Sequence, residues 1–217
     1  MSPRADPVAM IPLPTKIVCV GRNYAKHAQE LGNKVPERPL LFFKPPSSLI
    51  ADGDPIRLPR ASQQVEHEAE IGVVIGKLLR RADRAAARDA IAGITCVNDV
   101  TARDLQRSDG QWTRAKGFDT FCPVGPGVVP LAELPPLEEL EVIGRVNGNE
   151  RQHGYARDMA FDILTILVYV SEIMTLEPGD LVATGTPAGV GPLEPGDTVE
   201  VEVPGVGLLS NPVIDET

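Results

Sequence analysis

Glycine and proline are unusually frequent in this chain, and they constrain its fold more than any other feature. There are 20 Gly and 21 Pro, which together make 41 of the 217 residues. Glycine weakens helix interiors, and proline breaks them because it lacks an amide hydrogen and its ring collides with the preceding turn. A bundle of long helices is therefore excluded. Many short strands joined by turns fit this composition better.

The rest of the composition is that of a folded soluble protein, with 42% hydrophobic and 24% charged residues. The net charge of -9 argues against nucleic acid and anionic membranes as partners, because phosphate binding depends on clustered Lys and Arg. Cys19, Cys96 and Cys122 are widely spaced and predict neither a disulfide framework nor a zinc ribbon. No segment has the pattern of a signal peptide or a membrane span, so we predict a cytoplasmic protein.

Short apolar runs between turn residues predict the strands. We expect strands over residues 16–20, 40–43, 56–58, 65–75, 94–97 and 140–146, the last turning into a hairpin at Asn147-Gly148. The sequence Leu-Glu-Pro-Gly-Asp occurs at 176–180 and again at 193–197. We interpret it as a repeated turn before a strand rather than as a duplicated domain.

Helices are expected over 24–31, 82–92, 101–106 and 162–174. Asn23 is the predicted cap of the first helix and Gly32 its stop. Residues 107–127 show little periodicity and predict a long loop, a kind of segment that is usually functional. The chain as a whole predicts a loose N-terminal arm over 1–15 and one domain over 16–217.

Three carboxylates, Glu66, Glu68 and Glu70, occupy every second position of the expected strand 65–75. Residues two apart on a strand share a face, about 6.6 Å apart at Cα, so two of these side chains can converge on one hard cation. The alternative is a polar stripe that faces solvent. The apolar run 71–75 and the repulsion between like charges favour a cation. The spacing alone leaves both interpretations open.

Two further groups have spacings suited to chemistry. Asp99, Arg103 and Gln106 share one helical face, although Asp99 could simply cap the helix. His27 and Glu30 lie three apart, so that Glu30 could orient the imidazole as a general base for water. The alternative is a structural His beside a Lys26–Glu30 ion pair.

Lys116 lies between Trp112 and Phe118 in the expected loop. Partial desolvation there would make its charge effective on a developing oxyanion, whereas a loop lysine is ordinarily solvated. The segment 184–187, Thr-Gly-Thr-Pro, could donate hydrogen bonds to an anion or be an ordinary turn.

Taken together, these segments resemble the fumarylacetoacetate hydrolase family over about residues 16–212. The resemblance is carried by five ordered motifs at 21–27, 67–76, 98–106, 116–121 and 184–191. It points to the short, single-domain branch, which includes acylpyruvate hydrolases, oxaloacetate decarboxylases and isomerases of the homoprotocatechuate pathway. Because the resemblance covers no counterpart of the large N-terminal domain of the longer hydrolases, we do not expect their full substrate pocket to carry over.

The resemblance implies an α+β, mostly β fold, a mixed β-roll with a few peripheral helices, assembled as a homodimer around Mg²⁺ or Mn²⁺. By this resemblance the metal ligands are Glu68, Glu70 and Asp99, and Glu66 falls outside the set. The other roles that it implies are a catalytic pair, His27 and Glu30; groups that hold developing negative charge, Lys116 and Gln106; and substrate contacts, Arg22, Arg103 and Thr186.

The implied activity is hydrolysis of the C–C bond of an acylpyruvate, a small 2-oxo acid. Oxaloacetate decarboxylation and isomerisation of an unsaturated 2-hydroxy dioate are the alternatives, since all three reactions pass through a similar enolate. A non-catalytic binder of dicarboxylates is the alternative from another class of protein. The pair His27 and Glu30 favours an enzyme, because a binding protein needs no group that activates water.

Overall fold

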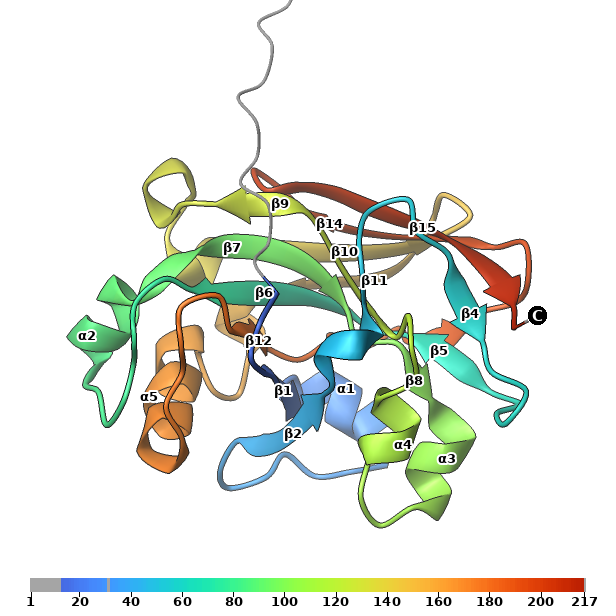
Figure 1. Ribbon diagram of the computed structural model, residues 1–217, viewed down its shortest axis with the longest axis horizontal. Coiled ribbons are helices and arrows are strands. Elements are labelled where there is room, and N and C mark those ends of the chain that lie inside the picture. The colour runs from blue at the N-terminus through green and yellow to red at the C-terminus, as the bar shows by residue number, and fades with distance from the viewer. Residues whose placement is uncertain (1–12, 31, 217) are drawn as a thin grey trace, which may run out of the picture.

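Curved sheets make up most of this protein, as the computed structural model shows for residues 13–30 and 32–216 (Figure 1). The largest sheet has seven strands in the order β2 (Leu40–Lys44), β1 (Ile17–Gly21), β12 (Leu181–Ala183), β6 (Ala69–Ile75), β7 (Ile91–Asn98), β9 (Cys122–Val129) and β3 (Leu49–Ile50). A five-stranded sheet has the order β11 (Asn149–Tyr155), β10 (Glu141–Val146), β14 (Thr198–Val203), β15 (Gly207–Asp215) and β4 (Ile56–Leu58). A three-stranded sheet contains β13 (Gly191–Pro192), β5 (Val65–His67) and β8 (Thr101–Ala102).

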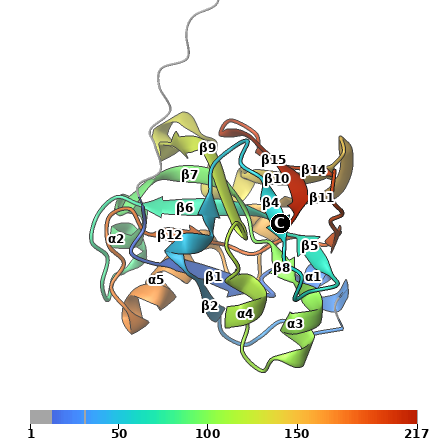
Figure 2. The same ribbon diagram turned by 45° about the vertical axis from the view of Figure 1, so that its right-hand side comes forward.

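The helices are short and lie at the periphery. They are α1 (Ala25–Glu30), α2 (Arg84–Asp89), α3 (Arg103–Ser108), α4 (Thr113–Lys116) and α5 (Ile163–Ile173). Helices α2 and α5 pack at one end of the molecule, whereas α1, α3 and α4 gather near β5 and β8 (Figures 1 and 2). Parallel pairs (β1 with β12, β3 with β9, β15 with β4) occur beside antiparallel ones, so the sheets are mixed. The predicted mostly β fold with peripheral helices is confirmed.

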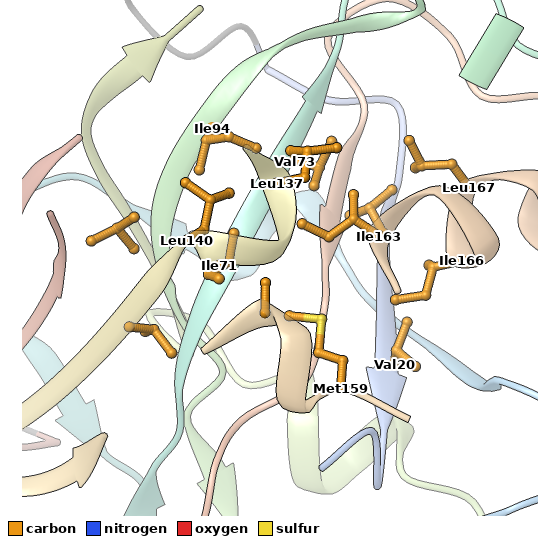
Figure 3. Packing of buried hydrophobic residues seen from close by; sticks show 14 of the residues in the cluster. Val20, Ile71, Val73, Ile94, Leu137, Leu140, Met159, Ile163, Ile166 and Leu167 are labelled. Carbon is orange, nitrogen blue, oxygen red and sulfur yellow. The ribbon is translucent and has the colours of Figure 1, made fainter. Parts of the chain in front are cut away.

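The main core lies where one face of the seven-stranded sheet meets α5 and the five-stranded sheet. Ile71 and Val73 of β6 belong to this core together with Ile166 and Leu167 of α5, and all four are fully buried (Figure 3). Burying a side chain of this size is worth about 1.5–3 kcal/mol. The apolar side chains of β6 and β7 therefore hold the seven-stranded sheet in place by their burial. The ends of these two strands can then carry polar side chains.

Several local predictions are confirmed. The helix expected over 162–174 is α5, and Asn147-Gly148 turns β10 into β11 with positive φ at both residues. Asp162 caps α5 by accepting a hydrogen bond from the Thr165 amide. The repeated turns also share their chemistry. Asp180 accepts a hydrogen bond from the amide of Glu177, and Asp197 accepts the equivalent one from Glu194, both at 2.8 Å.

The expected loop over 107–127 is wrong. It contains α4 and most of the eight-residue strand β9, which pairs with β7 and β3. Pro123, Gly125, Pro126 and Gly127 gave this strand the composition of a loop. The pairing of β9 with β7 shifts register between Ile94 and Cys96, so its ladder is irregular where these residues fall.

Other boundaries differ because of strand pairing. The expected strand 65–75 breaks at Glu68 into β5 and β6, which belong to different sheets. The expected helix 82–92 ends at Asp89, since residues from 91 onward join β7, and that strand is longer than the expected 94–97. Thr101 and Ala102 form β8, so the helix expected at 101–106 begins at Arg103.

The start of α1 is held by tertiary contacts and not by the expected cap. The side-chain oxygen of Asn23 accepts from the Phe161 amide, while its nitrogen donates to the carbonyls of Phe161 and Thr184. Gly32 follows the helix with φ of 70°, as a C-terminal stop requires. Leu31, the expected last residue of the helix, lies outside the described residues, as does most of the predicted arm 1–15. In the described part of the chain, no helix has the length and apolarity to cross a membrane.

Candidate metal centre and active-site cavity

One cavity of about 520 Å³ gathers the side chains of the predicted site. It lies among α1, α3 and α4 and the ends of β1 and β6, and it is lined by nine of the ten predicted residues: Arg22, His27, Glu30, Glu68, Glu70, Arg103, Gln106, Lys116 and Thr186. The tenth, Asp99, has no exposed surface. It lies behind the residues that line the cavity and contacts one of them, Lys116. Segments far apart in sequence therefore meet at one polar cavity.

The register of β6 and β7 places three carboxylates together. Ala69 pairs with Asn98, so the residues around the start of β6 face the end of β7. The Asp99 amide donates to the Glu68 carbonyl at 2.9 Å, which locks this junction. One carboxylate oxygen from each of Glu68, Glu70 and Asp99 lies within 4.8 Å of the others, and all three residues are buried.

Three buried cations balance these acids. Lys116 Nζ lies 2.6 Å from Asp99 Oδ2 and 2.9 Å from Glu68 Oε2. Lys44 Nζ, at the end of β2, lies 2.5 Å from Asp99 Oδ1 and donates to the Val100 carbonyl. The guanidinium of Arg103 contacts Glu68 at 2.6 Å. Each carboxylate that is buried with such a partner can remain ionised.

Glu66 has a separate role, as the motif match implied. Its carboxylate pairs with Arg103 Nε at 2.7 Å and accepts a hydrogen bond from Gln64. The break between β5 and β6 puts Glu66 in the three-stranded sheet, so the alternating carboxylates do not lie along one strand. Glu66 thus holds Arg103, and it is not part of the three-carboxylate cluster.

The charges shift two pKa values in opposite directions. Burial by itself would raise the pKa of Glu68, but Lys116 and Arg103 hold that pKa well below its usual value. Burial raises the pKa of Glu70, and the negative charges of Asp99 and Glu68 raise it further. Glu70 is therefore the acid that gains most from an additional cation in the cluster.

The donor set fits a hard divalent cation. It consists only of carboxylate oxygens, which suit Mg²⁺ or Mn²⁺ better than softer metals. Asp99 Oδ1 is buried against the Lys44 ammonium, and Oδ2 is buried against that of Lys116. We therefore assign Glu68, Glu70 and Asp99 as residues that could hold the metal.

His27 and Glu30 form a pair on α1 at the cavity. His27 Nδ1 lies 3.3 Å from Glu30 Oε2, and the imidazole is buried. The Gly189 amide donates to both oxygens of Glu30, at 3.1 and 3.2 Å. A proton on Nδ1 would leave Nε2 unprotonated and able to accept one. The arrangement is that of a base oriented by a carboxylate, itself held by the backbone.

The side chains of Arg103 and Gln106 are hydrogen-bonded to each other. Arg103 Nη1 donates to Gln106 Oε1 at 2.6 Å, so each of the three guanidinium nitrogens donates one hydrogen bond, to Glu66, Glu68 and Gln106. Gln106 also lines the cavity, and its amide nitrogen is a hydrogen-bond donor by type.

Arg22 and Thr186 also line the cavity. The Arg22 guanidinium lies 5.7 Å from the centre of the Trp112 ring. The Lys116 ammonium lies 4.9 Å from the centre of the Phe42 ring. The sequence had suggested Trp112 and Phe118 as its aromatic neighbours and gave no indication of Phe42.

Sequence reasoning missed Lys44 and Arg107, which complete the polar surroundings. Lys44 is one of only six lysines and follows an apolar strand directly, a place where a solvated lysine is unusual. That position was the available signal. Arg107 lies one residue beyond a predicted site residue and gave no separate signal.

Comparison with known proteins identifies the relatives of this chain. Residues 16–214 match the family model described as fumarylacetoacetate (FAA) hydrolase C-terminal. An uncharacterized protein of Methanocaldococcus jannaschii is 50% identical over 203 residues, 94% of this chain and 84% of that protein. A mitochondrial oxaloacetate decarboxylase of Dictyostelium discoideum is 44% identical over 196 residues, 88% of this chain and 89% of that protein.

The fold comparison agrees. The crystal structure of a 5-carboxymethyl-2-hydroxymuconate delta-isomerase from Mycobacterium smegmatis superimposes with a TM-score of 0.88 at 45% identity, covering 97% of this chain and 82% of the other. The motifs, the cavity with its carboxylate cluster, the family match and the shared fold lead to one assignment: this chain belongs to the fumarylacetoacetate hydrolase family.

Proposed function

We propose that this protein is a divalent-metal-dependent enzyme that hydrolyses the C–C bond of a short acylpyruvate to pyruvate and a carboxylic acid. The observation that carries the proposal is the position of the His27–Glu30 pair in the same cavity as Glu68 and Glu70. A base for water and a cluster suited to Mg²⁺ or Mn²⁺ are the two components that this reaction needs.

The buried charges suit an anionic substrate. Four carboxylates (Glu66, Glu68, Glu70 and Asp99) stand against three cations (Lys44, Arg103 and Lys116). The difference of one negative charge would become one positive charge with a divalent cation in place. A positive cavity of this kind attracts a 2-oxo acid, and Arg22 at the wall adds to the attraction.

The residues of this chain would act in sequence. His27, oriented by Glu30, would take a proton from water as the water oxygen bonds to the distal carbonyl carbon of the substrate. Lys116 and the Gln106 amide would hold the resulting alkoxide, at about 2.7–4 kcal/mol per donor in comparable sites. The C–C bond then breaks, the acyl group leaves as the acid, and the pyruvate enolate takes up a proton at its methylene carbon. A bound metal would polarise the 2-oxo acid and stabilise the enolate as a Lewis acid.

The test is turnover of acetylpyruvate with Mg²⁺ or Mn²⁺, followed by loss of its enol absorbance. His27→Ala should abolish hydrolysis, whereas His153→Ala should not, because His153 is an exposed histidine on β11 that pairs with Glu141. Glu68→Ala should remove metal binding and activity together. Full activity after chelation would contradict the metal assignment, and an unchanged rate in His27→Ala would place the base elsewhere.

Decarboxylation of oxaloacetate is a second candidate, favoured by the named activity of the Dictyostelium discoideum relative. Arg22 and Arg107 at the cavity could receive the second carboxylate of such a substrate. The same preparation should therefore be assayed with oxaloacetate and with an unsaturated 2-hydroxy dioate, the substrate of the alternative isomerase activity. Saturable binding of these acids with turnover of none would instead support a dicarboxylate-binding protein.

A further inference from the structure

Gln152 is a buried amide on β11 that belongs to none of the predicted site groups. Its exposed fraction is 1%, although Glu150, Arg151 and His153 around it are exposed. The pairing of β10 with β11 skips Arg151, since Gly144 pairs with Gln152 and Arg145 with Glu150. A β-bulge of this kind re-aims the next side chain. It directs Gln152 away from solvent and toward the seven-stranded sheet.

All of the hydrogen-bonding capacity of this amide is used. Its oxygen accepts from the Ala69 amide at 2.9 Å and lies 2.9 Å from His67 Nδ1. Its nitrogen donates to Thr186 Oγ1 at 2.6 Å and to the Pro187 carbonyl at 2.7 Å. The Ala69 amide can only donate and the Pro187 carbonyl can only accept, so these backbone groups fix which end of the amide is oxygen.

The segment 184–189 that Gln152 holds connects the two halves of the cavity. At one end, the Gly185 amide donates to Glu70 Oε2 at 2.8 Å. In the middle, Thr186 lines the cavity and donates to the Ala69 carbonyl at 2.9 Å. At the other end, the Gly189 amide holds the Glu30 carboxylate. One short segment thus contacts a candidate metal ligand and the partner of the candidate base.

This segment also packs directly on the backbone of β11. A Cβ added to Gly189, whose φ is 102°, would lie 1.9 Å from the Arg151 carbonyl oxygen. A Cβ added to Gly154 would lie 2.8 Å from the Pro187 ring. Backbone contacts this close leave the segment little freedom, because any shift against β11 must also move Gln152.

We propose that Gln152 is a positioning residue that sets the distance between the carboxylate cluster and the His27–Glu30 pair through segment 184–189. It is not one of the residues that line the cavity, nor does it belong to the carboxylate cluster. By holding Thr186 and Pro187, it keeps the carboxylates of Glu70 and Glu30 at a fixed distance from each other. This inference rests on the proposed function for its effect on turnover, but its effect on metal binding can be measured without a substrate.

The test compares Gln152→Met with Asn211→Leu. Asn211 is a matched control because it is also 1% exposed and donates from its side-chain nitrogen to two carbonyls, those of Ala51 and Asp54, outside the cavity. Both variants lose two buried donors at nearly constant shape, so both should lose thermal stability. Only Gln152→Met should lower kcat, by about tenfold or more, and weaken Mn²⁺ binding measured by calorimetry, since outer partners of a metal site typically contribute this much.

A double variant separates positioning from general weakening of the fold. In the Glu30→Gln background, Gln152→Met should cost much less in kcat than it does alone, because both changes disable the same pair. Multiplicative losses would overturn the proposal, as would equal effects of Gln152→Met and Asn211→Leu on kcat and on Mn²⁺ affinity. If Gln152→Met does not fold, Gln152→Glu carries the same expectations, since it keeps an acceptor for Ala69 and loses both donors. Inactivity of the wild type toward every substrate would refute the proposed function, and the Mn²⁺ comparison would still decide the role of Gln152.

Discussion

Replacing Lys44 by methionine should destabilise the metal-free protein far more than a surface substitution does. Its side chain has no exposed surface, and its ammonium lies 2.5 Å from Asp99 Oδ1 and 3.0 Å from the Val100 carbonyl. Methionine keeps the shape of the side chain and removes the charge. Of the cations within residues 13–30 and 32–216, Asp99 would then keep Lys116 alone at contact distance.

The magnitude follows from the burial of both partners. Removing one partner of a buried ion pair costs about 3–5 kcal/mol, because the other charge stays buried without compensation. For a domain of this size each kcal/mol shifts Tm by about 2–4 °C, so the loss is roughly 6–20 °C. Lys77→Met is the matched control, since Lys77 pairs with Asp89 at 2.8 Å with both side chains more than half exposed. An exposed pair is worth about 0–1 kcal/mol.

The assay is urea and thermal unfolding of both variants in EDTA and then with Mn²⁺. In EDTA, Lys44→Met should lose several times more stability than Lys77→Met. With Mn²⁺, Lys44→Met should recover part of the loss, because a divalent cation replaces the missing positive charge beside Asp99. The reasoning is refuted if the two variants are equally stable in EDTA, since the buried pair would then contribute no more than the exposed one.

The other predictions concern a glycine, a turn and the metal. Gly189→Ala should lower kcat and stability through collision with Arg151, whereas Gly196→Ala, with similar φ and open space, should change stability alone. Asp180→Asn should destabilise by at least about 1.5 kcal/mol and Asp197→Asn by less, because Asp180 is buried and accepts from several donors. Burial opposes the ionised form of Asp180, but hydrogen bonds from Lys16, Glu177 and Thr15 lower its pKa below the usual value. Its contribution is therefore present above about pH 3.8 and lost below, and acid titration of Asp180→Asn should show a shallower limb. Chelation should abolish turnover, and Mg²⁺ or Mn²⁺ should restore it.

Local structure was predictable where it depends on neighbours in the chain. The Asn147-Gly148 hairpin, the capped helix α5 and the two Leu-Glu-Pro-Gly-Asp turns follow from contacts within a few residues. The strand β9 was not predictable, because Pro and Gly within it mask a pairing that β7 and β3 supply. Propensity describes one segment at a time, whereas a sheet strand is stabilised by segments elsewhere.

The candidate site was also predictable only in part. The motifs indicated Glu68, Glu70 and Asp99, and the register Ala69 with Asn98 brings them together. The spacing of Glu66 suggested a shared face with Glu68 and Glu70, but the strand breaks and Glu66 instead holds Arg103. Periodicity is valid only within an unbroken strand, and the sequence did not show where this strand ends.

The sequence by itself determined the class of fold, the turns and the chemical types of the candidate site residues, because these depend on composition, local geometry and ordered motifs. Only the tertiary structure decided how the cavity is supported. Lys44 contacts the chain at Val100, 56 positions away, and Gln152 binds the Ala69 amide, 83 positions away. Such contacts depend on sheet order, strand curvature and a bulge that aims one side chain inward. These features are set by the packing of the whole chain, so no local pattern encodes them.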